Sequence, residues 1–257
     1  MKMRKICAVL LCAVMLMTVF TACETKLDPE KLETKAAMKL LEEPYVLTMK
    51  MSYASDNEEL QEVYDQLSGV ETKIYMDGTD FTMSMDLMGQ SVSYTCVDKV
   101  LYLEMMGMKL KGALTDEQIK DMTADMAGSS FTGMRSAGFA SCTVTEEDDG
   151  SVVISCLGFD DEASDLLDSL MGEMGSEEGA EVSVDTEKVS YIAVIDPEGA
   201  YSELAVKVPM VMNIAEYGDV SMEIAVEMTF DYEGGIEITA PADADQYTDM
   251  DMSEVVG

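Results

Sequence analysis

The side chains available for chemistry in this 257-residue chain are carboxylates, thiols and thioethers, because the sequence contains no histidine. Histidine-based catalytic triads, histidine metal sites and the commonest general base are therefore excluded. No glycine-rich phosphate loop is present either. Glu223, Glu227 and Asp231 share one strand face but are spaced about 13 Å apart, too far for a glycosidase pair. We therefore expect a protein that is not an enzyme and needs no cofactor.

Methionine is in excess, with 25 copies. Several pairs have the pattern Met-x-Met, and thioethers at this spacing suit the soft ion Cu(I). A strand places every second side chain on one face, however, so core packing explains such pairs without a metal. The acidic stretch Asp148-Asp149-Gly150 lacks the twelve-residue spacing of a calcium loop. We therefore expect no metal site. The pairs are Met49/Met51, Met83/Met85, Met106/Met108, Met210/Met212 and Met250/Met252.

Two cysteines are placed for a disulfide. Cys142 and Cys156 lie equidistant from a turn centred on Asp149, so a hairpin would bring them face to face at a separation that a disulfide can span. The alternative is a pair of buried thiols. Cys96 alternates with Val92 and Tyr94 and is expected to be a buried free thiol.

The strands that must position these residues are clearest between Val70 and Met105, where apolar and polar residues alternate in four runs. Two-residue loops at Asp77-Gly78, Gly89-Gln90 and Asp98-Lys99 connect the runs. Pairing across these loops predicts an antiparallel meander with one apolar and one wet face. It sets Met85 opposite Tyr94, Met83 opposite Cys96, and Tyr94 opposite Leu103.

Amphipathic helices are predicted around this meander. Asp28-Pro29 provides the N-cap and first residue of a helix that continues to about Glu43, with Leu41 on its apolar stripe. A second helix is expected over 58–67, and Thr115 with Gln118 forms a capping box for a third. A further helix is expected from about 161, with its apolar face formed by Leu166, Leu167, Leu170, Met171 and Met174.

The remaining strands follow the same period of two, and the acidic segments are expected to be loops. Pro209 cannot donate to a ladder, so its strand should lie at an edge or carry a bulge there. The runs 128–138 and 172–187 are expected to be surface loops, and 242–257 a frayed tail. Strands are expected over 45–53, 108–111, 139–147, 151–157, 191–196, 204–214, 220–230 and 236–239.

The N-terminal 22 residues are expected to be an export signal, with basic residues, an apolar core over 6–20 and a small-residue processing site. Phe20-Thr21-Ala22-Cys23 resembles the lipobox of bacterial lipoproteins, although Phe20 replaces the usual aliphatic residue. The resemblance implies a Cys23 that is acylated and tethered through 23–27 to the outer face of the cell membrane; ordinary secretion is the alternative. A net charge of −35 repels nucleic acid and anionic lipid, so the anchor is the expected membrane contact.

The order of these elements, closing with Ile236-Glu237-Ile238-Thr239-Ala240-Pro241, resembles the LolA/LppX-like lipoproteins over about 28–247. The resemblance implies an α+β fold: a strongly curved antiparallel sheet, an open half-barrel of about 10–12 strands, with three to four helices covering its concave apolar face. The acidic tail 248–257 would follow this single domain. In this family a cavity between sheet and helices carries lipids or lipid-like molecules.

Two functions are therefore expected as alternatives. The first is a carrier or sensor for an apolar molecule held between sheet and helices. The second is a structural or interaction lipoprotein with a solid core and no ligand. The expected ligand-binding residues of the carrier are Met49, Met51, Met83, Met85, Tyr94, Leu103, Met222, Ile224 and Met228.

Overall fold

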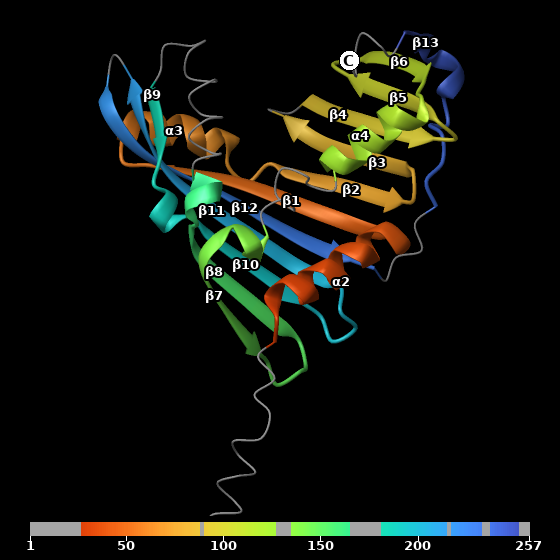
Figure 1. Ribbon diagram of the computed structural model, residues 1–257. Helices are drawn as coiled ribbons and strands as arrows, with labels where there is room; N and C mark the ends of the chain where they lie inside the picture. Colours follow the sequence, from red (N-terminus) through yellow and green to blue (C-terminus); the bar gives the residue numbers. More distant parts are fainter. Residues whose placement is uncertain are drawn as a thin grey trace, which may run out of the picture.

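The computed structural model describes residues 27–87, 90–126, 135–164, 181–214, 217–232 and 237–251. They form an α+β fold built on one 13-stranded, mostly antiparallel sheet that is curved and not closed (Figure 1). The predicted export signal, the anchor at Cys23 and the apolar face expected over 166–174 lie outside the described residues.

The sheet consists of two meanders joined by one long strand. The strand order is β13-β6-β5-β4-β3-β2-β1-β12-β11-β10-β8-β7, and β9 pairs with β11 outside this path. Strand β1 pairs with β2 on one side and with β12 on the other, so it connects the halves. The strands are β1 (Tyr45–Ser55), β2 (Glu71–Asp77), β3 (Asp80–Leu87), β4 (Gln90–Val97), β5 (Val100–Met105), β6 (Met108–Ala113), β7 (Phe139–Glu146), β8 (Val152–Phe159), β9 (Glu181–Val184), β10 (Ser190–Ile195), β11 (Tyr201–Ile214), β12 (Gly218–Asp231) and β13 (Thr248–Asp249).

The four-stranded meander is confirmed, and its register is partly corrected. Tyr94 lies opposite Leu103 as predicted, but it also lies opposite Met83, and Cys96 lies opposite Phe81. The pairing of β3 with β4 continues to Leu87 and Gln90, so the connection begins one residue earlier than predicted. That change moves the register by two residues, which keeps every side chain on its predicted face. Asp77 likewise pairs with Asp80, so the first turn is Gly78-Thr79.

One apolar row crosses almost the whole sheet. Its members pair directly from strand to strand, and they lie on the face that carries the hydrophobic core. Burial of this face supplies most of the folding free energy, because about 25 cal/mol is gained per Å² of apolar surface removed from water. In strand order the row is Met105, Val92, Met85, Thr72, Met49, Met228, Leu204, Ala193, Ile154 and Val144.

The described helices begin where their capping residues predict. The side chain of Asp28 accepts from the Lys31 N–H at the start of α2 (Pro29–Glu42). Asn57 caps α3 (Glu58–Leu67), and Thr115 and Gln118 form the predicted capping box before α4 (Asp116–Met126). Ile119 of α4 is buried in the hydrophobic core.

Leu41 does not lie on the buried side of α2, contrary to prediction. Ala36 and Glu33 are fully buried, whereas Leu41 is 82% exposed. Leu41 is five residues beyond Ala36 and is therefore rotated by about 140° around the helix. The stripe was predicted from the hydrophobic residues alone. It was misplaced because the carboxylate of Glu33 lies at the centre of the buried side.

Pro209 lies in the interior of the sheet, so the predicted edge or bulge is wrong. It pairs with Glu223 of β12 within a continuous register. Its carbonyl accepts from the Asp185 N–H at 2.9 Å, on the other side of the strand. In an antiparallel strand the N and O of one residue point to the same side, so the proline nitrogen points toward β9 and β10. On that side, pairing with β10 ends at Lys207 and pairing with β9 begins at Met210. Pro209 lies between these two ladders, where no N–H is needed.

Three segments predicted as irregular or extended differ in the structure. The acidic run 172–187 contains β9 and the start of the 3₁₀ helix η2 (Thr186–Lys188), because β9 pairs with the far end of β11. The described part of the strand predicted over 236–239 is irregular chain. The segment that follows is docked instead of frayed: it contains the 3₁₀ helix η3 (Ala244–Gln246) and β13, which runs parallel to β6.

The C-terminal segment is held on the polar face by one buried tyrosine. Tyr247 is 6% exposed and packs edge-on against Tyr102 at 5.3 Å between ring centroids. Its hydroxyl donates to Glu104 at 3.3 Å, and the ammonium of Lys109 lies 5.5 Å from its ring. Lys109 also pairs with Asp243.

We expect Tyr247→Ala to undock this segment while leaving the two meanders folded. Removing a buried aromatic ring costs about 3–5 kcal/mol where the site cannot collapse. The Met250 N–H, which donates to the Lys111 carbonyl, should then exchange with solvent faster. Hydrogen exchange read at residues 243–251 tests this, with the exposed-site variant Thr248→Ala as control. Unchanged protection in Tyr247→Ala would contradict the assigned role.

Candidate functional site

The nine expected ligand-binding residues lie on one face of the sheet. Met49 of β1 pairs with Met228 of β12, and Met83 of β3 pairs with Tyr94 of β4. The other members alternate on the same strands or pair with members of the same face, as Leu103 does with Tyr94. The structure therefore brings all nine onto the apolar face, and we call this set the methionine face.

The methionine face is less completely filled than the adjoining part of the same sheet surface. Leu103, Met222 and Met228 are buried, while the other six residues are half-buried. On β8 and β10, by contrast, Ile154 and Ala193 are wholly buried. The half-buried members of the methionine face are Met49, Met51, Met83, Met85, Tyr94 and Ile224.

Helix α3 approaches one end of the methionine face through an aromatic pair. Tyr64 stacks on Tyr53 of β1 with 5.7 Å between ring centroids. Its hydroxyl donates to the Met222 sulfur at 3.5 Å. Met222 is therefore covered by α3, which accounts for its burial.

A buried carboxylate, Glu33, fastens α2 to the other part of the sheet. Glu33 is fully buried, and its Oε1 accepts from the Tyr191 hydroxyl at 2.7 Å. Its Oε2 accepts from the N–H and the hydroxyl of Ser136, at 2.9 and 2.5 Å. The Tyr201 hydroxyl donates to the Glu33 backbone carbonyl at 3.3 Å. Both carboxylate oxygens thus have partners, which is the condition for burying such a group. We call Glu33, Ser136, Tyr191 and Tyr201 the Glu33 network.

The surroundings of the Glu33 network keep its tyrosines protonated. Burial raises the pKa of Tyr191 far above its usual value, and the neighbouring Tyr201 and Glu33 raise it further. Burial also raises the pKa of Tyr201, again with a contribution from Glu33. Both hydroxyls therefore remain hydrogen-bond donors throughout the physiological pH range.

Sequence reasoning missed Glu33, although a signal was present. The apolar stripe of α2 contains Leu32, Ala36, Ala37 and Leu40, and Glu33 lies within that stripe. If the helix is rotated, a carboxylate in such a position is exposed to solvent. Otherwise it is buried and accepts hydrogen bonds from nearby donors. Its donors come from β10, β11 and the 3₁₀ helix η1 (Ser136–Gly138), which are distant in sequence.

No family model matches the chain, and no curated protein matches it. The site is therefore interpreted from its own chemistry.

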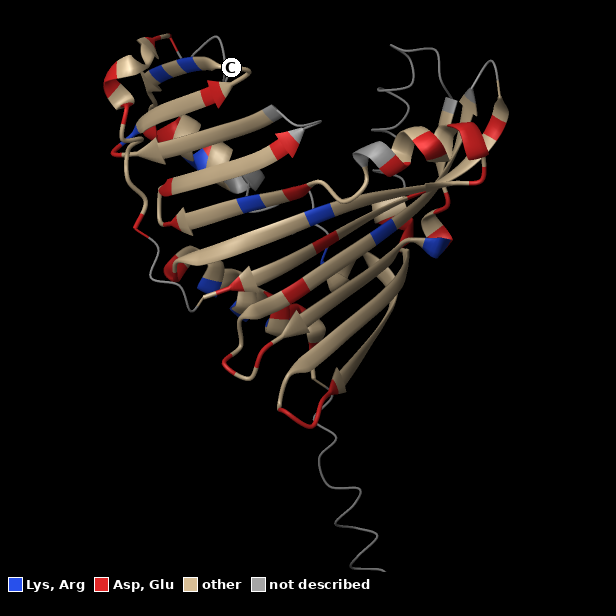
Figure 2. Cartoon of the chain, turned by 180° about the vertical axis from the view of Figure 1, so that it is seen from behind, with Lys and Arg blue, Asp and Glu red and all other residues tan. Residues whose placement is uncertain are grey.

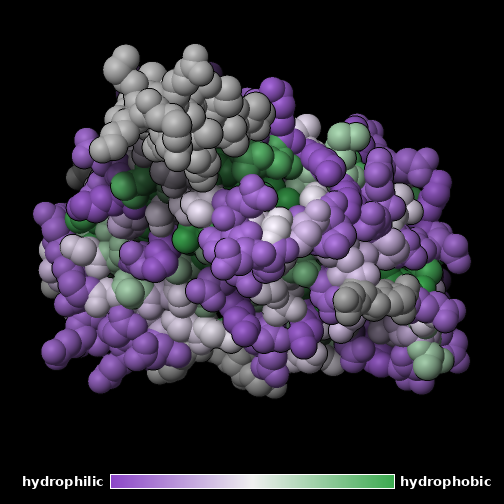
Figure 3. All heavy atoms as spheres, turned by 90° about the horizontal axis from the view of Figure 1, so that it is seen from below, coloured by the Kyte–Doolittle hydropathy of each residue, from purple (hydrophilic) through white to green (hydrophobic). Residues whose placement is uncertain are grey.

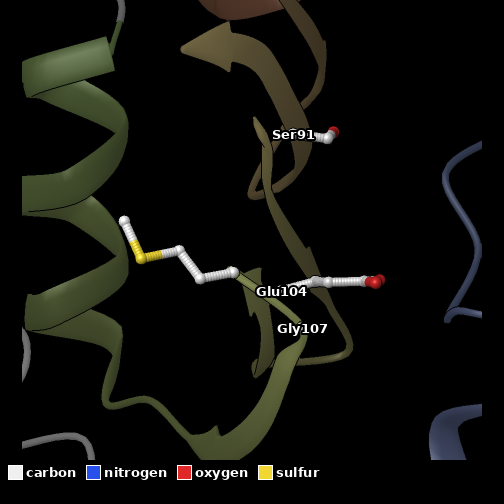
Figure 4. Close-up of a pocket in the computed structure, with 4 residues that line it drawn as sticks. Ser91, Glu104 and Gly107 are labelled. Carbon is white, nitrogen blue, oxygen red and sulfur yellow. The ribbon is translucent and has the colours of Figure 1, made fainter. Parts of the chain in front are cut away.

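The described surface also contains two open depressions that are lined mainly by residues of the face opposite the methionine face. One, of about 440 Å³, is lined by Ser91, Glu104, Met106 and Gly107, and Figure 4 shows Ser91 and Glu104 projecting to the same side. The other, of about 230 Å³, shares Ser91 and includes Lys73. Lysines and carboxylates mix along the strands of this face (Figure 2), where Glu71 pairs with Lys73 at 3.1 Å and Lys50 at 3.5 Å.

In the described ranges, no three side chains of the histidine, cysteine, aspartate or glutamate type come together as metal ligands. A membrane-crossing helix is likewise not found there, since none of the helices is long and apolar enough.

Cys142 and Cys156 are opposite each other on β7 and β8 and are joined by a disulfide with an S–S distance of 2.06 Å. Cys96 is a buried free thiol, and burial raises its pKa to about 11.

We expect the native protein to show no alkylation at 142 and 156 before reduction. The double variant Cys142→Ser/Cys156→Ser should lose about 3 kcal/mol of unfolding free energy, as for a loop of this length. Intact mass of alkylated samples, with and without reduction, tests the first effect, and urea unfolding measures the second. Full alkylation of the unreduced, denatured protein would refute the bond.

Tyr232 contrasts with the tyrosines of the Glu33 network. Its hydroxyl is buried and has no hydrogen-bond partner among the described residues, and its ring lies beside Tyr45 at 6.1 Å between ring centroids. An unpaired buried hydroxyl costs about 1–3 kcal/mol. We therefore expect Tyr232→Phe to leave stability unchanged or raise it by about 1 kcal/mol, and Tyr191→Phe to lower it by about 1–3 kcal/mol. Thermal and urea unfolding of the two variants test the contrast, and equal losses would contradict it.

Proposed function

We propose that this chain is a lipoprotein that binds an apolar or lipid-like molecule between its sheet and its helices, as a carrier or sensor. In this proposal three to four helices cover the concave apolar side of an open half-barrel, as in the LolA/LppX-like lipoproteins. Cys23 is acylated and holds the domain on the outer face of the cell membrane. No enzymatic step and no cofactor are involved.

The observation that carries the proposal is the half-buried state of the methionine face. Six of its side chains, on one face of a curved sheet, retain exposed surface, while neighbouring rows on β8 and β10 are closed. Methionine is flexible and polarizable, so a surface rich in it repacks readily around varied apolar ligands. The Glu33 network fastens α2 to β10 and η1.

The proposed location has separate support. A disulfide between Cys142 and Cys156 suits an oxidising compartment outside the cytoplasm. The sequence before Leu27 has the pattern of an export signal followed by a lipobox. Acylation at Cys23 would anchor the chain at about 0.8 kcal/mol per buried methylene, with two or more chains needed for stable attachment.

Native mass spectrometry of the full chain after gentle extraction tests the binding function. We expect a co-purifying apolar molecule, or binding of a fluorescent fatty acid. The variant Met49→Gln/Met83→Gln should weaken this binding roughly tenfold, since two apolar contacts are replaced by polar groups. The matched control Met106→Gln/Met108→Gln changes two exposed methionines and should bind as the wild type does.

The second candidate is a structural or interaction lipoprotein with a solid core. It is favoured by the continuity of the buried cluster, which extends from Phe81 and Leu101 to Ile154. Absence of ligand from the native wild type, together with no probe binding, would establish this alternative.

A further inference from the structure

The strands that carry the methionine face present no charged side chain to it. On β1, β2, β3, β4, β5 and β12, none of the described residues that alternate onto this side is an aspartate, glutamate, lysine or arginine. The chain as a whole has a net charge of −35. Hydrophilic residues cover most of the underside of the molecule, for example, with only small apolar patches between them (Figure 3). A ligand on the methionine face therefore meets no charged side chain from these strands.

Thr72 of β2 is a buried polar residue in the middle of this apolar surface. It is 6% exposed, and it pairs with Met49 of β1 on one side and with Met85 of β3 on the other. Its side chain forms no hydrogen bond within the part of the chain that the structure describes. The register therefore places one unpaired hydroxyl between two half-buried thioethers.

The other three buried polar side chains of the described residues are hydrogen-bonded. The carboxylate of Glu33 accepts from the hydroxyl of Ser136, and the hydroxyls of Thr95 and Thr82 lie 2.9 Å apart. Buried polar groups have such partners as a rule, because water no longer satisfies them. A polar group of a bound molecule would satisfy Thr72 in the same way.

A second hydroxyl, that of Tyr94, is also unpaired on this face. Tyr94 of β4 is half-buried and pairs with Met83 of β3, whereas Thr72 pairs with Met85, two residues further along β3. The Tyr94 hydroxyl forms no hydrogen bond with the residues described. The two hydroxyls thus lie on either side of β3, and a molecule lying along Met83 and Met85 passes between them.

Resting on the binding function proposed above, we infer that the ligand of the methionine face is an uncharged lipid with an ester or hydroxyl group that hydrogen-bonds to Thr72 and Tyr94. A carboxylate or phosphate on this face would lose its water without gaining a cationic partner from the strands, which is costly for an ionised group. An ester carbonyl is uncharged and accepts hydrogen bonds, and a lipid hydroxyl both donates and accepts them. A fatty acid binds by its chain alone, with its carboxylate left in water, and therefore binds more weakly.

Competition between two lipids of equal acyl length tests the selection against charge. The full chain is incubated with the uncharged dye N-phenyl-1-naphthylamine, whose fluorescence reports an apolar site. Methyl hexadecanoate or hexadecanoate is then added at about pH 8, where the acid is ionised. The ester should displace the dye at a concentration at least about tenfold lower than the acid.

Two conservative variants test the hydroxyls. Thr72→Val replaces the hydroxyl with a methyl group of similar size, and Tyr94→Phe removes only the phenol oxygen. Each should weaken binding of the ester about three- to tenfold and leave the affinity for the dye unchanged. The control Thr229→Val removes an exposed hydroxyl from the opposite face and should bind as the wild type does. Thr72→Val should also unfold at the wild-type temperature or above it, because it removes an unpaired hydroxyl, so weaker binding reports a lost contact with the ligand.

The outcomes separate this inference from the proposed function. Equal displacement by ester and acid, or wild-type affinity for the ester in both hydroxyl variants, overturns the inference and leaves the binding function standing. If the dye, the ester and the acid all fail to bind the wild-type chain, the proposed function fails and the inference fails with it.

Discussion

Replacing Glu33 with alanine is expected to destabilise the fold by about 3–5 kcal/mol, the range seen when one partner of a buried polar network is removed. The change leaves the Tyr191 hydroxyl and both Ser136 donors without an acceptor in a site closed to water. Each buried donor left unpaired costs about 1–3 kcal/mol. Because Glu33 joins α2 to β10 and η1, the loss should appear first as exposure of α2.

Urea unfolding measures this loss, and two further variants identify its cause. Glu42→Ala removes an exposed carboxylate from the same helix and should change the unfolding free energy by less than about 0.5 kcal/mol. Glu33→Gln keeps the shape and the acceptor for Tyr191 but turns an amide toward Ser136, so an intermediate loss is expected. A Glu33→Ala variant as stable as Glu42→Ala would show that the network contributes nothing.

Most strands were predictable from sequence because they have one buried face, which alternation reports directly; β9 and the exposed β13 carry too little of that pattern and were missed. The pattern from Val70 to Met105 predicted four strands and a shared apolar face, and the structure has both. Register depends on where each loop begins, which alternation does not determine. The predicted loop at Gly89-Gln90 therefore shifted the pairing of Met83 and Met85 by two residues without changing their face.

The features that could not be predicted from the sequence depend on contacts between residues that are far apart along the chain. Glu33 is stabilised by donors from 136 and 191, and only the fold brings them together. Tyr247 is buried because it lies against Tyr102 and Glu104 of β5, so the described part of an acidic tail that was predicted to be frayed is docked. The nine residues of the methionine face were predictable as a set because they follow the same alternation as the core.

The second large effect is expected at alkaline pH, where buried tyrosines should make the fold unstable. Burial raises the pKa of Tyr45 to about 12 and raises the pKa values of Tyr191, Tyr201 and Tyr232 as well. In the unfolded chain each hydroxyl ionises near pH 10. The stabilisation from a raised pKa is fully present below pH 10 and is lost as the pH rises from there through the folded-state value.

Four such groups should lower the unfolding free energy by about 5–6 kcal/mol per pH unit between about pH 10 and pH 12, at 1.4 kcal/mol for each group. A domain with 5–15 kcal/mol of stability would approach its unfolding midpoint by roughly pH 12. Urea titrations at successive pH values give the slope, and tyrosinate absorbance shows that ionisation accompanies unfolding. Tyr45→Phe should reduce the slope by about one quarter, whereas Tyr75→Phe on the opposite face should not change it. Tyrosinate absorbance that accounts for all 11 tyrosines near pH 10 while the chain remains folded would mean that the buried hydroxyls are accessible to water, and the closed packing around Glu33 would have to be abandoned.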